Sequence, residues 1–345
     1  MKAGFLSALF LISLIAAPAI AAVPLPASVV VPDRGHDLFA AASMTRSQRN
    51  SSIPTDWGIF RRDGIGEWSL FGPRILGVAG LAYDPTNPQV LLLAAGDGVL
   101  RSEDRGRSWR QVTGWRISDV RSFAFDSGDP SRVYAATQWG PILSIDGGRS
   151  WVSAAAGLPV RYAQTLVADR RVPGRVLLGT ESGLFVSENG AASWAPVDSP
   201  PVTILRVVQS ASRPELFLAG TEGRGAWRST DGGRFWQSLD PATASANLYA
   251  VAIRPDEANT LALGGWGVGV RISTDGGVTW ASRGAGLPNQ WVQVLAFDPD
   301  RPGRLWAAVR EEGSYVSDDL GLTWQFAGLY GAYGHDYAFV PIVSR

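Results

Sequence analysis

Residues Ser229–Trp236 of the 345-residue chain read STDGGRFW, and related octapeptides recur along the sequence. Seven copies begin at residues 61, 102, 144, 187, 229, 273 and 317, so successive copies are 41, 42, 43, 42, 44 and 44 residues apart. Five copies fit the pattern S-x-D-x-G-x-x-W, the copy at 187 has Asn189 in place of the aspartate, and the copy at 61 keeps only Asp63 and Trp68. This near-equal spacing indicates one structural unit that is repeated seven times.

Each unit has the pattern of four short β-strands. In the second full unit, Val120–Phe125 is typical of a strand, the turn residues Asp129-Pro130 follow, and Val133–Ala136 forms a second strand rich in small residues. A glycine-containing loop leads to a third strand that ends at the octapeptide, and Trp151 opens the fourth. Four strands in about 40–45 residues are typical of a propeller blade. The sequence therefore predicts an all-β, seven-bladed β-propeller of four-stranded blades.

The two ends of the chain contain the remaining strands. Residues 336–342 look like a first strand with nothing after it, and residues 37–41 look like a second strand with nothing before it. Residues 57–60 and 68–71 then supply the third and fourth strands. We expect the closing blade to be shared by both termini, because this closure leaves no long unpaired sheet edge.

The residue types of the octapeptide suit a tight hairpin turn. Glycine at the fifth position can adopt a positive φ, and the Ser and Asp side chains can bond to the backbone of the turn. The Trp ring is expected to pack against the hairpin and to donate through its indole N–H. We interpret these positions as structural: Asp63, Asp104, Asp146, Asn189, Asp231, Asp275 and Asp319, with Trp68, Trp109, Trp151, Trp194, Trp236, Trp280 and Trp324. The alternative, a row of calcium-binding carboxylates, lacks the six to eight oxygen ligands, roughly, that calcium needs.

The octapeptides resemble the Asp-box, or BNR, repeats of sialidases, xyloglucanases, sortilin and the photosystem II assembly and stability factors. The resemblance covers nearly the whole chain after residue 21. One seven-bladed propeller behind a signal peptide is most similar to the assembly-factor type, which implies the binding of a protein partner. Because unrelated activities share this scaffold, the resemblance is specific for the repeat rather than for the function.

The enzyme branches of this resemblance fit less well. Sialidases have six blades, an FRIP-like motif and three substrate-binding arginines, and the nearest strings here, Phe60-Arg61-Arg62 and Pro73-Arg74-Ile75-Leu76, do not match. Xyloglucanases of this type use two propellers that face one cleft, and sortilin-type proteins have ten blades and a Cys-rich module. We therefore carry over no catalytic residue onto this sequence.

The composition excludes several other kinds of chemistry. The 31 basic and 31 acidic residues give a formal net charge of zero, so a general nucleic-acid role has no support. The chain has no cysteine, and its two histidines, His36 and His335, are expected on opposite faces of the propeller. No phosphate-binding loop, G-x-S-x-G or H-E-x-x-H motif is present. We predict no metal site and no cofactor.

The N-terminus has the pattern of a secretory signal. Lys2 supplies the positive charge, residues 5–16 supply the apolar run, and Ala19-Ile20-Ala21 supplies the cleavage site. The alternative of a membrane anchor is less favoured, because the run is shorter than about 20 residues and Pro18 interrupts it. We expect residues 1–21 to be a signal peptide and residues 22–345 to be a single propeller, exported to the periplasm or outside the cell.

The resemblance places ligands of propellers on the face opposite the octapeptides. There the loops between the second and third strands and the connections between blades carry aromatic, acidic and arginine residues. The candidates for partner or ligand binding are Trp139, Glu181, Glu222, Arg224, Trp266, Glu311, Tyr162 and Trp291. Aromatic and arginine side chains are enriched at protein interfaces, whereas aromatic rings beside paired carboxylates suit glycan binding or hydrolysis. Packing between blades is the plainer interpretation of any single residue in this set.

The function that we favour from the sequence is an exported, non-enzymatic propeller that binds a protein partner. A glycan-binding or glycan-cleaving propeller is the alternative, and the sequence leaves the enzyme question open. One polar connection, residues 43–56 with Arg46 and Arg49, is longer than its counterparts in other blades. It is either a partner-binding lid or a simple insertion.

Overall fold

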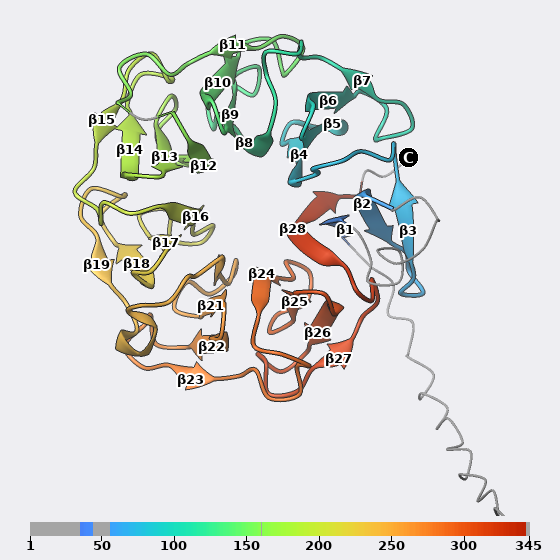
Figure 1. Cartoon of the computed structure of the whole chain (residues 1–345), viewed down its shortest axis with the longest axis vertical. Coiled ribbons are helices and arrows are strands. Elements are labelled where there is room, and N and C mark those ends of the chain that lie inside the picture. The colour runs from blue at the N-terminus through green and yellow to red at the C-terminus, as the bar shows by residue number, and fades with distance from the viewer. Residues whose placement is uncertain (1–34, 44–55, 160, 343–345) are drawn as a thin grey trace, which may run out of the picture. The chain divides into compact units, whose positions relative to one another are not determined.

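Seven antiparallel sheets of four strands each follow one another around a ring in the computed structural model, which describes residues 35–43, 56–159 and 161–342 (Figure 1). All of these residues belong to one compact unit, Pro32–Arg345. The predicted fold class is therefore confirmed: the chain is a seven-bladed β-propeller. The predicted signal peptide and the long polar connection lie outside the described residues, apart from the ends of that connection.

The blades are numbered here along the chain, and their strands are given from the axis of the ring outward. Blade I contains β4 (Gly80–Asp84), β5 (Asn87–Ala95), β6 (Gly98–Ser102) and β7 (Arg110–Gln111). Blade II contains β8 (Val120–Phe125), β9 (Val133–Thr137), β10 (Gly140–Ser144) and β11 (Val152–Ser153). Blade III contains β12 (Ala163–Ala168), β13 (Val176–Thr180), β14 (Gly183–Ser187) and β15 (Ala195–Pro196).

The next three blades repeat this order. Blade IV contains β16 (Ile204–Gln209), β17 (Phe217–Thr221), β18 (Ala226–Ser229) and β19 (Gln237–Ser238). Blade V contains β20 (Ala250–Ile253), β21 (Leu261–Gly265), β22 (Gly269–Ser273) and β23 (Ala281–Ser282), and a short 3₁₀ helix, η1 (Pro241–Thr243), precedes it. Blade VI contains β24 (Val292–Phe297), β25 (Leu305–Val309), β26 (Gly313–Ser317) and β27 (Gln325–Phe326).

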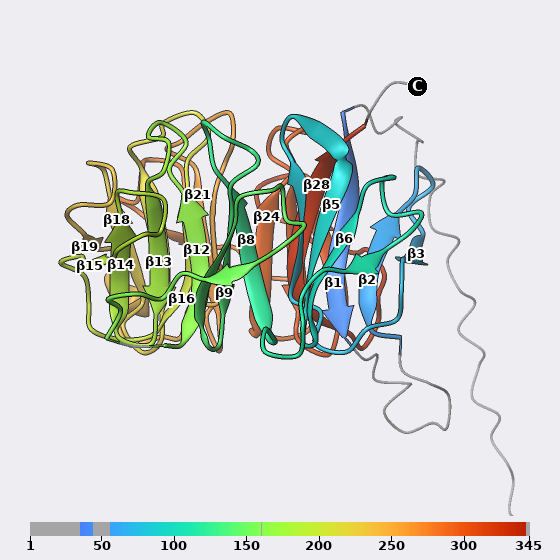
Figure 2. The same cartoon turned by 90° about the horizontal axis from the view of Figure 1, so that it is seen from above.

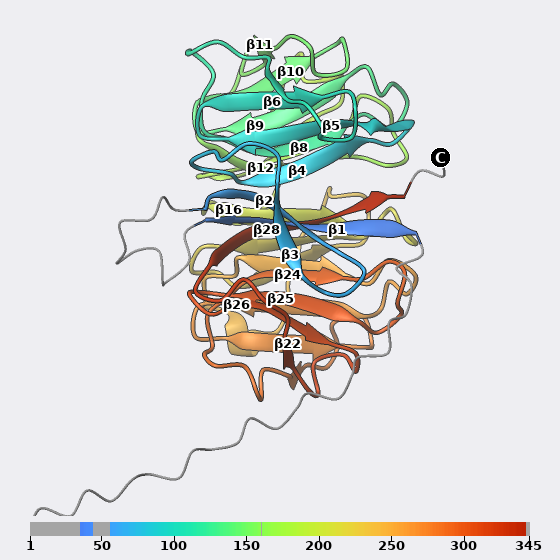
Figure 3. The ribbon, with the colours of Figure 1, turned by 90° about the vertical axis from the view of Figure 1, so that its right-hand side faces the viewer.

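Blade VII joins the two ends of the described chain, as predicted. Its strands are β28 (Tyr333–Pro341), β1 (His36–Ser43), β2 (Gly58–Arg62) and β3 (Trp68–Phe71). Strand β28 pairs antiparallel with β1, so that Phe39 lies opposite Ala338 (Figure 3). The hydroxyl groups of Tyr337 and of Ser314 in blade VI share a buried hydrogen bond, with their oxygen atoms 2.6 Å apart. The last strand therefore links the first strand of the chain to the neighbouring blade.

The second strand of each blade forms the densest part of the core. Residues Leu91, Leu92 and Leu93 of β5 have at most 1% of their surface exposed, because neighbouring blades cover both faces of the strand. Small residues in this strand allow the blades to approach closely. A Cβ atom at Gly220 in β17, for example, would lie 2.3 Å from the carbonyl oxygen of Leu248, in the connection that leads into blade V. The small residues noted in the sequence therefore mark where blades touch.

The octapeptide turns are held by the side chains of their own Ser and Asp residues. In the turn at Ser229–Trp236, the Ser229 hydroxyl donates to Asp231 Oδ1 at 2.7 Å and accepts from the Gly233 N–H at 2.8 Å. The Asp231 carboxylate also accepts from the Phe235 N–H at 3.0 Å. Gly233 has a φ of 81°, a conformation that favours glycine. These bonds satisfy backbone groups that the sheet cannot pair at the turn.

The tryptophans of these turns fall into two groups that the sequence does not distinguish. Four indole N–H groups donate to a carbonyl of their own turn, namely those of Trp109, Trp151, Trp236 and Trp280. The other three donate to the preceding blade: Trp68 to Ala327, Trp194 to Ala154, and Trp324 to Arg283. The second group therefore connects blades as well as closing a turn.

The turn aspartates predict an acid-sensitive contribution to stability. Hydrogen bonds from the Ser108 hydroxyl and N–H lower the pKa of Asp104 to about 2, and those from Thr323 lower the pKa of Asp319 to about 2, against 3.8 for a free aspartate. Because the folded pKa lies below the unfolded value, this stabilisation is complete above about pH 4 and is lost as the pH falls toward 2. We expect Asp104→Asn and Asp319→Asn to flatten the fall of the melting temperature over this pH range.

The turn at Ser187–Trp194 supplies a matched control. Asn189 Oδ1 accepts from the Ser193 N–H at 3.0 Å, which reproduces the aspartate geometry without a titrating group. We expect Asn189→Asp to steepen the same part of the melting curve against pH. An unchanged pH profile in all three variants would show that these carboxylates do not couple folding to pH.

Candidate functional site

The strands run between two faces of the propeller (Figure 2). We call the face with the octapeptides and the loops between first and second strands the turn face. The opposite face, with the loops between second and third strands and the connections between blades, is the loop face. His36, at the start of β1, forms a hydrogen bond with Asp300 on the turn face. His335, near the start of β28, forms a hydrogen bond of 2.7 Å with Oγ of Ser43, which ends β1 on the loop-face side. The two histidines therefore lie apart, as expected.

Four aromatic rings from three neighbouring blades gather on the loop face, three of them around one arginine. Tyr249 and Trp266 have ring centroids 5.7 Å apart, and Trp266 and Trp291 have centroids 6.3 Å apart. The Arg310 guanidinium carbon lies 5.1 Å from the Trp266 ring, 5.4 Å from the Trp291 ring and 5.4 Å from the Tyr333 ring. We call these five residues the aromatic cluster. Trp266 and Trp291 remain 46% and 47% exposed, so the cluster presents a broad apolar surface to solvent.

The backbone and the rings fix Arg310 in the centre of the cluster. Its N–H donates to the Trp291 carbonyl at 2.9 Å, and its own carbonyl accepts from Asn289 Nδ2 at 3.2 Å. A guanidinium within about 6 Å of a ring centroid is attracted by the ring quadrupole, with roughly 0.5–2 kcal/mol per contact. Three such contacts hold the side chain and the exposed rings in one arrangement. The cluster is therefore a preorganised surface rather than a set of independent side chains.

Two carboxylates border the aromatic cluster. Glu311, next to Arg310, has a φ of 60° and accepts a hydrogen bond from the Tyr333 hydroxyl. Burial raises the pKa of Tyr249, and the negative charge of Glu222 raises it further. Glu222, on the exposed loop between β17 and β18 of blade IV, is therefore near enough to Tyr249 for its charge to act there. The rim of the cluster thus offers negative charge beside aromatic surface.

The structure brings some of the candidate residues together and leaves others apart. Trp266, Trp291 and Glu311 meet at the cluster, with Glu222 beside it. Arg224 is exposed on the same loop as Glu222, and its carbonyl accepts from the Trp227 indole at 2.9 Å. The other three candidates, Trp139, Glu181 and Tyr162, lie over blades II and III. The Trp139 indole donates to Ser118 Oγ at 3.1 Å, and the Tyr162 hydroxyl donates to Gln164 Oε1 at 2.7 Å. Glu181 is exposed.

Sequence reasoning missed the residue at the centre of the cluster. Arg310 immediately precedes Glu311 in the loop between β25 and β26, and Tyr333 begins β28. Neither position repeats in the other blades as the octapeptides do. Only the curvature of the ring brings these loops together, and no signal in the sequence marks that contact.

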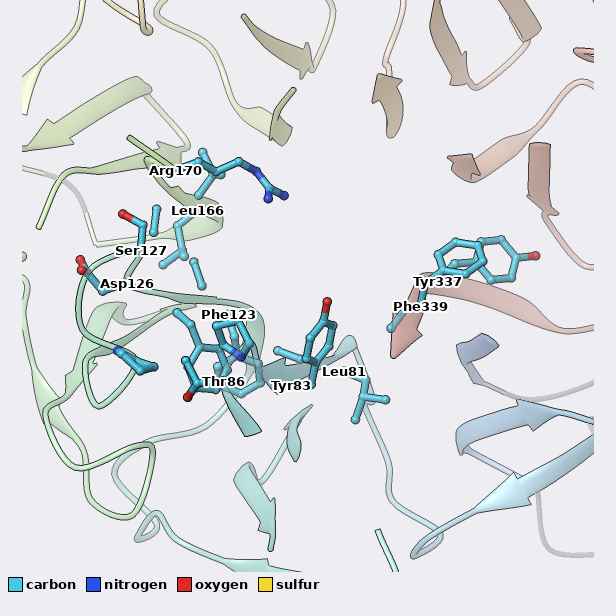
Figure 4. A pocket seen from close by; sticks show the side chains of 18 residues that line it. Leu81, Tyr83, Thr86, Phe123, Asp126, Ser127, Leu166, Arg170, Tyr337 and Phe339 are labelled. Carbon is cyan, nitrogen blue, oxygen red and sulfur yellow. The ribbon is translucent and has the colours of Figure 1, made fainter. Parts of the chain in front are cut away.

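A channel along the axis of the propeller contains several cavities that share lining residues. At the turn face, a cavity of about 550 Å³ is lined mainly by apolar side chains such as Leu81, Phe123 and Phe339. Tyr83 and Arg170 point into it (Figure 4). At the loop face, a smaller cavity of about 170 Å³ is polar and includes Tyr249 of the aromatic cluster. The apolar cavity was not expected from the sequence.

Among residues 35–43, 56–159 and 161–342, no three or more His, Asp and Glu side chains are grouped so that they could hold a metal ion. In the same residues no helix has the length and apolarity that a membrane span requires. These two findings concern only the part of the chain that the structure describes.

Several solved propeller structures are similar to this chain. The GH74 enzyme of Niastella koreensis aligns with a TM-score of 0.67 and 18% identity, over 86% of this chain and 55% of that one. The GH74 xyloglucanase of Xanthomonas campestris aligns with a TM-score of 0.64 and 20% identity, again over 86% and 55%. A structure of YCF48 bound to D1 peptide aligns with a TM-score of 0.59 and 18% identity, over 74% of this chain and 83% of that one.

The chain spans about half the length of the two GH74 enzymes. No protein-family model matches the sequence, and no curated protein matches it either. At identities of 20% or less, the likeness to solved structures establishes the fold alone. The chain is a seven-bladed β-propeller whose structural neighbours include GH74 propellers and YCF48.

Proposed function

We propose that this chain is an exported, non-enzymatic propeller that binds a protein partner through the aromatic cluster on its loop face. The observation that carries the proposal is the packing of three aromatic rings from three blades around Arg310, with a fourth ring, that of Tyr249, stacked beside Trp266. Trp, Tyr and Arg are the residue types that dominate binding energy at protein interfaces. Export rests on the sequence of residues 1–21 alone.

The geometry of the cluster favours binding without a large ordering cost. Immobilising a flexible side chain at an interface costs about 0.5–1.5 kcal/mol. The rings and the guanidinium already hold one another in place, so a partner finds them ordered. The carboxylates Glu222 and Glu311 at the rim add polar contacts around an apolar centre, which is the usual anatomy of an interface.

One structural neighbour supports this class of function. YCF48 has been solved bound to a D1 peptide, so a propeller of this fold binds a polypeptide segment. The alignment with this chain covers 83% of YCF48, which means that the shared part is most of that protein. A single propeller is thus large enough for such a function.

The second candidate is a propeller that binds or cleaves a glycan. Exposed rings such as Trp266 and Trp291 can serve as stacking platforms, and two structural neighbours are GH74 enzymes. Glycoside hydrolysis requires two carboxyl groups that flank one bond. Of the carboxylates on the loop face, Asp336 is in an ion pair with Arg206 at 2.7 Å and Glu311 accepts from Tyr333. These existing partners favour the protein-binding proposal.

The test compares the wild-type chain with Trp291→Ala as bait in extracts of the native host. Proteins that only the wild type enriches are purified, and their affinities are measured by calorimetry. We expect Trp291→Ala and Arg310→Ala each to weaken the affinity about 30-fold, the effect of losing about 2 kcal/mol at an interface hot spot. Trp115→Ala is the matched control, because Trp115 is 84% exposed on the same face outside the cluster.

Three outcomes would count against the proposal. The first is an identical set of enriched proteins for wild type and Trp291→Ala, and the second is an equal loss of affinity in Trp115→Ala. The third is release of reducing ends from a panel of polysaccharides by the wild type, abolished in Glu222→Gln or Glu311→Gln. That last result would favour the glycosidase alternative.

A further inference from the structure

Five of the seven innermost strands contain a β-bulge, one extra residue near the loop-face end of the strand. In blade II, Val120 lies opposite Thr137 and Ser122 lies opposite Ala136, so Arg121 between them has no partner in the ladder. The equivalent irregularity occurs in β12, β16, β24 and β28. The unpaired residues are Arg121, Gln164, Leu205, Gln293 and His335.

All five bulged residues line the same cavity. It has a volume of about 170 Å³ and lies at the loop-face end of the axial channel. A β-bulge changes the direction of a side chain and interrupts pairing, and such bulges are common beside functional sites. Here the repeated bulge gathers four polar side chains from four blades at the mouth of the channel. We call this cavity the channel mouth.

Of the two arginines that line the channel mouth, one has no hydrogen bond or ion pair within the described part of the chain. Arg206 is neutralised by Asp336, at 2.7 Å. Arg121 stacks its guanidinium 5.1 Å from the Tyr162 ring, and it has no hydrogen bond or ion pair with any described residue. Its Nε atom is buried. Burial of the ring among the channel-lining residues lowers the pKa of His335, Asp336 opposes this shift, and the Arg121 charge adds to it.

The channel mouth also has a buried acceptor without a donor. Gln293 Oε1 is buried and has no hydrogen-bond partner among the described residues. A buried polar atom that lacks a partner is unfavourable, because it has lost its hydrogen bonds to water. Arg121 therefore needs an acceptor and Gln293 needs a donor in the same cavity. Either ordered water or a ligand with both groups can satisfy them.

We propose that the channel mouth binds a small carboxylate that carries a hydroxyl or an amide N–H beside the carboxyl group. The carboxylate would accept from Arg121, and the neighbouring O–H or N–H would donate to Gln293 Oε1. The cavity, of about 170 Å³, has room for a hydroxy acid or a short amide acid.

Glycolate, acetate and glycolamide are the probes, and binding to the purified full chain is measured by calorimetry. Acetate lacks the hydroxyl donor, and glycolamide lacks the negative charge. We expect glycolate to bind at least tenfold more tightly than either. Arg121→Gln should lower the affinity for glycolate at least tenfold. Gln293→Leu should lower the affinity for glycolate to that for acetate, and it should leave the affinity for acetate unchanged.

Two controls keep the result interpretable. Arg107→Gln removes an exposed arginine on the turn face and should leave glycolate binding unchanged. Trp291→Ala alters the aromatic cluster at a ring that packs on Trp266 and Arg310 and does not line the cavity, so it should also leave glycolate binding unchanged. This variant separates the site from the proposed protein interface. If Arg121→Gln does not fold, Gln293→Leu tests the same cavity independently.

The absence of saturable glycolate binding by the folded wild type would overturn the proposal and would mean that the cavity holds water only. Equal affinities for glycolate and acetate would overturn the role of Gln293. Equal affinities for glycolate and glycolamide would overturn the role of Arg121.

Discussion

Replacing Trp236 with alanine is expected to lower the free energy of unfolding by about 3–5 kcal/mol, the usual cost of removing a buried large aromatic side chain. Trp236 is 3% exposed, its indole donates to the Gly233 carbonyl at 3.1 Å, and its ring lies 6.5 Å from that of Phe217. Its neighbours include Leu177 and Leu184 of blade III. The substitution therefore opens a cavity between two blades as well as removing a hydrogen bond.

The adjacent residue provides the control for this prediction. Phe235 occupies the same turn but is 54% exposed, so Phe235→Ala should change the free energy of unfolding by less than about 0.5 kcal/mol. Trp280 makes the same indole bond and is half-buried, and its loss should fall between the two. Denaturant unfolding monitored by two probes measures all three. Equal effects for Trp236 and Phe235 would show that the ring does not hold the blades together.

Replacing Arg175 with methionine is expected to cost a similar amount, about 3–5 kcal/mol, because it leaves a buried charge without its partner. The side chains of Asp169 and Arg175 are 0% and 3% exposed and lie 2.7 Å apart. Asp169 keeps its bonds from the Arg171 N–H and Gln209 Nε2, at 2.9 and 3.1 Å, and an ion pair with Arg171 Nε at 3.9 Å. The Arg171 side chain is 43% exposed, so this longer ion pair offsets little of the buried charge. Arg175 also forms an ion pair with Glu188, but Glu188 is exposed, so this pair contributes less to stability than the buried pair with Asp169.

A double substitution separates the ion pair from the packing of the arginine. Asp169→Asn combined with Arg175→Met removes both charges and keeps an acceptor for the two remaining bonds. We expect the double variant to be more stable than Arg175→Met alone, because a neutral amide costs less to bury than a carboxylate. If the double variant lost the sum of the two single effects, the two side chains would not be coupled.

The sequence predicted the blades, their number and the shared closing blade, because each of these depends on a repeated local pattern. The octapeptide turn is defined by residues within eight positions of one another, and the bonds of Ser229 and Asp231 are of this local kind. The closing blade followed from counting strands at the two ends. The order of β28 and β1 in one sheet confirms that count.

Properties that depend on contacts between blades could not be predicted in the same way. Trp236 and Trp280 occupy equivalent positions in the repeat, yet only Trp236 is buried. Arg310 lies beside a candidate residue but gains its role only from rings on neighbouring blades. The bulge at Arg121 likewise leaves no mark in the sequence, since it appears only when the two strands are paired.

The loop face, rather than the turn face, is where we expect a partner to bind. Hydrogen–deuterium exchange of the chain, alone and with the protein that it captures, tests this expectation most directly. We expect the partner to slow exchange in residues 247–250, 265–268, 289–292 and 310–313, and to leave the turns at 229–236 and 273–280 unchanged. Protection confined to those turns, with none around Arg310, would contradict the assignment of the loop face.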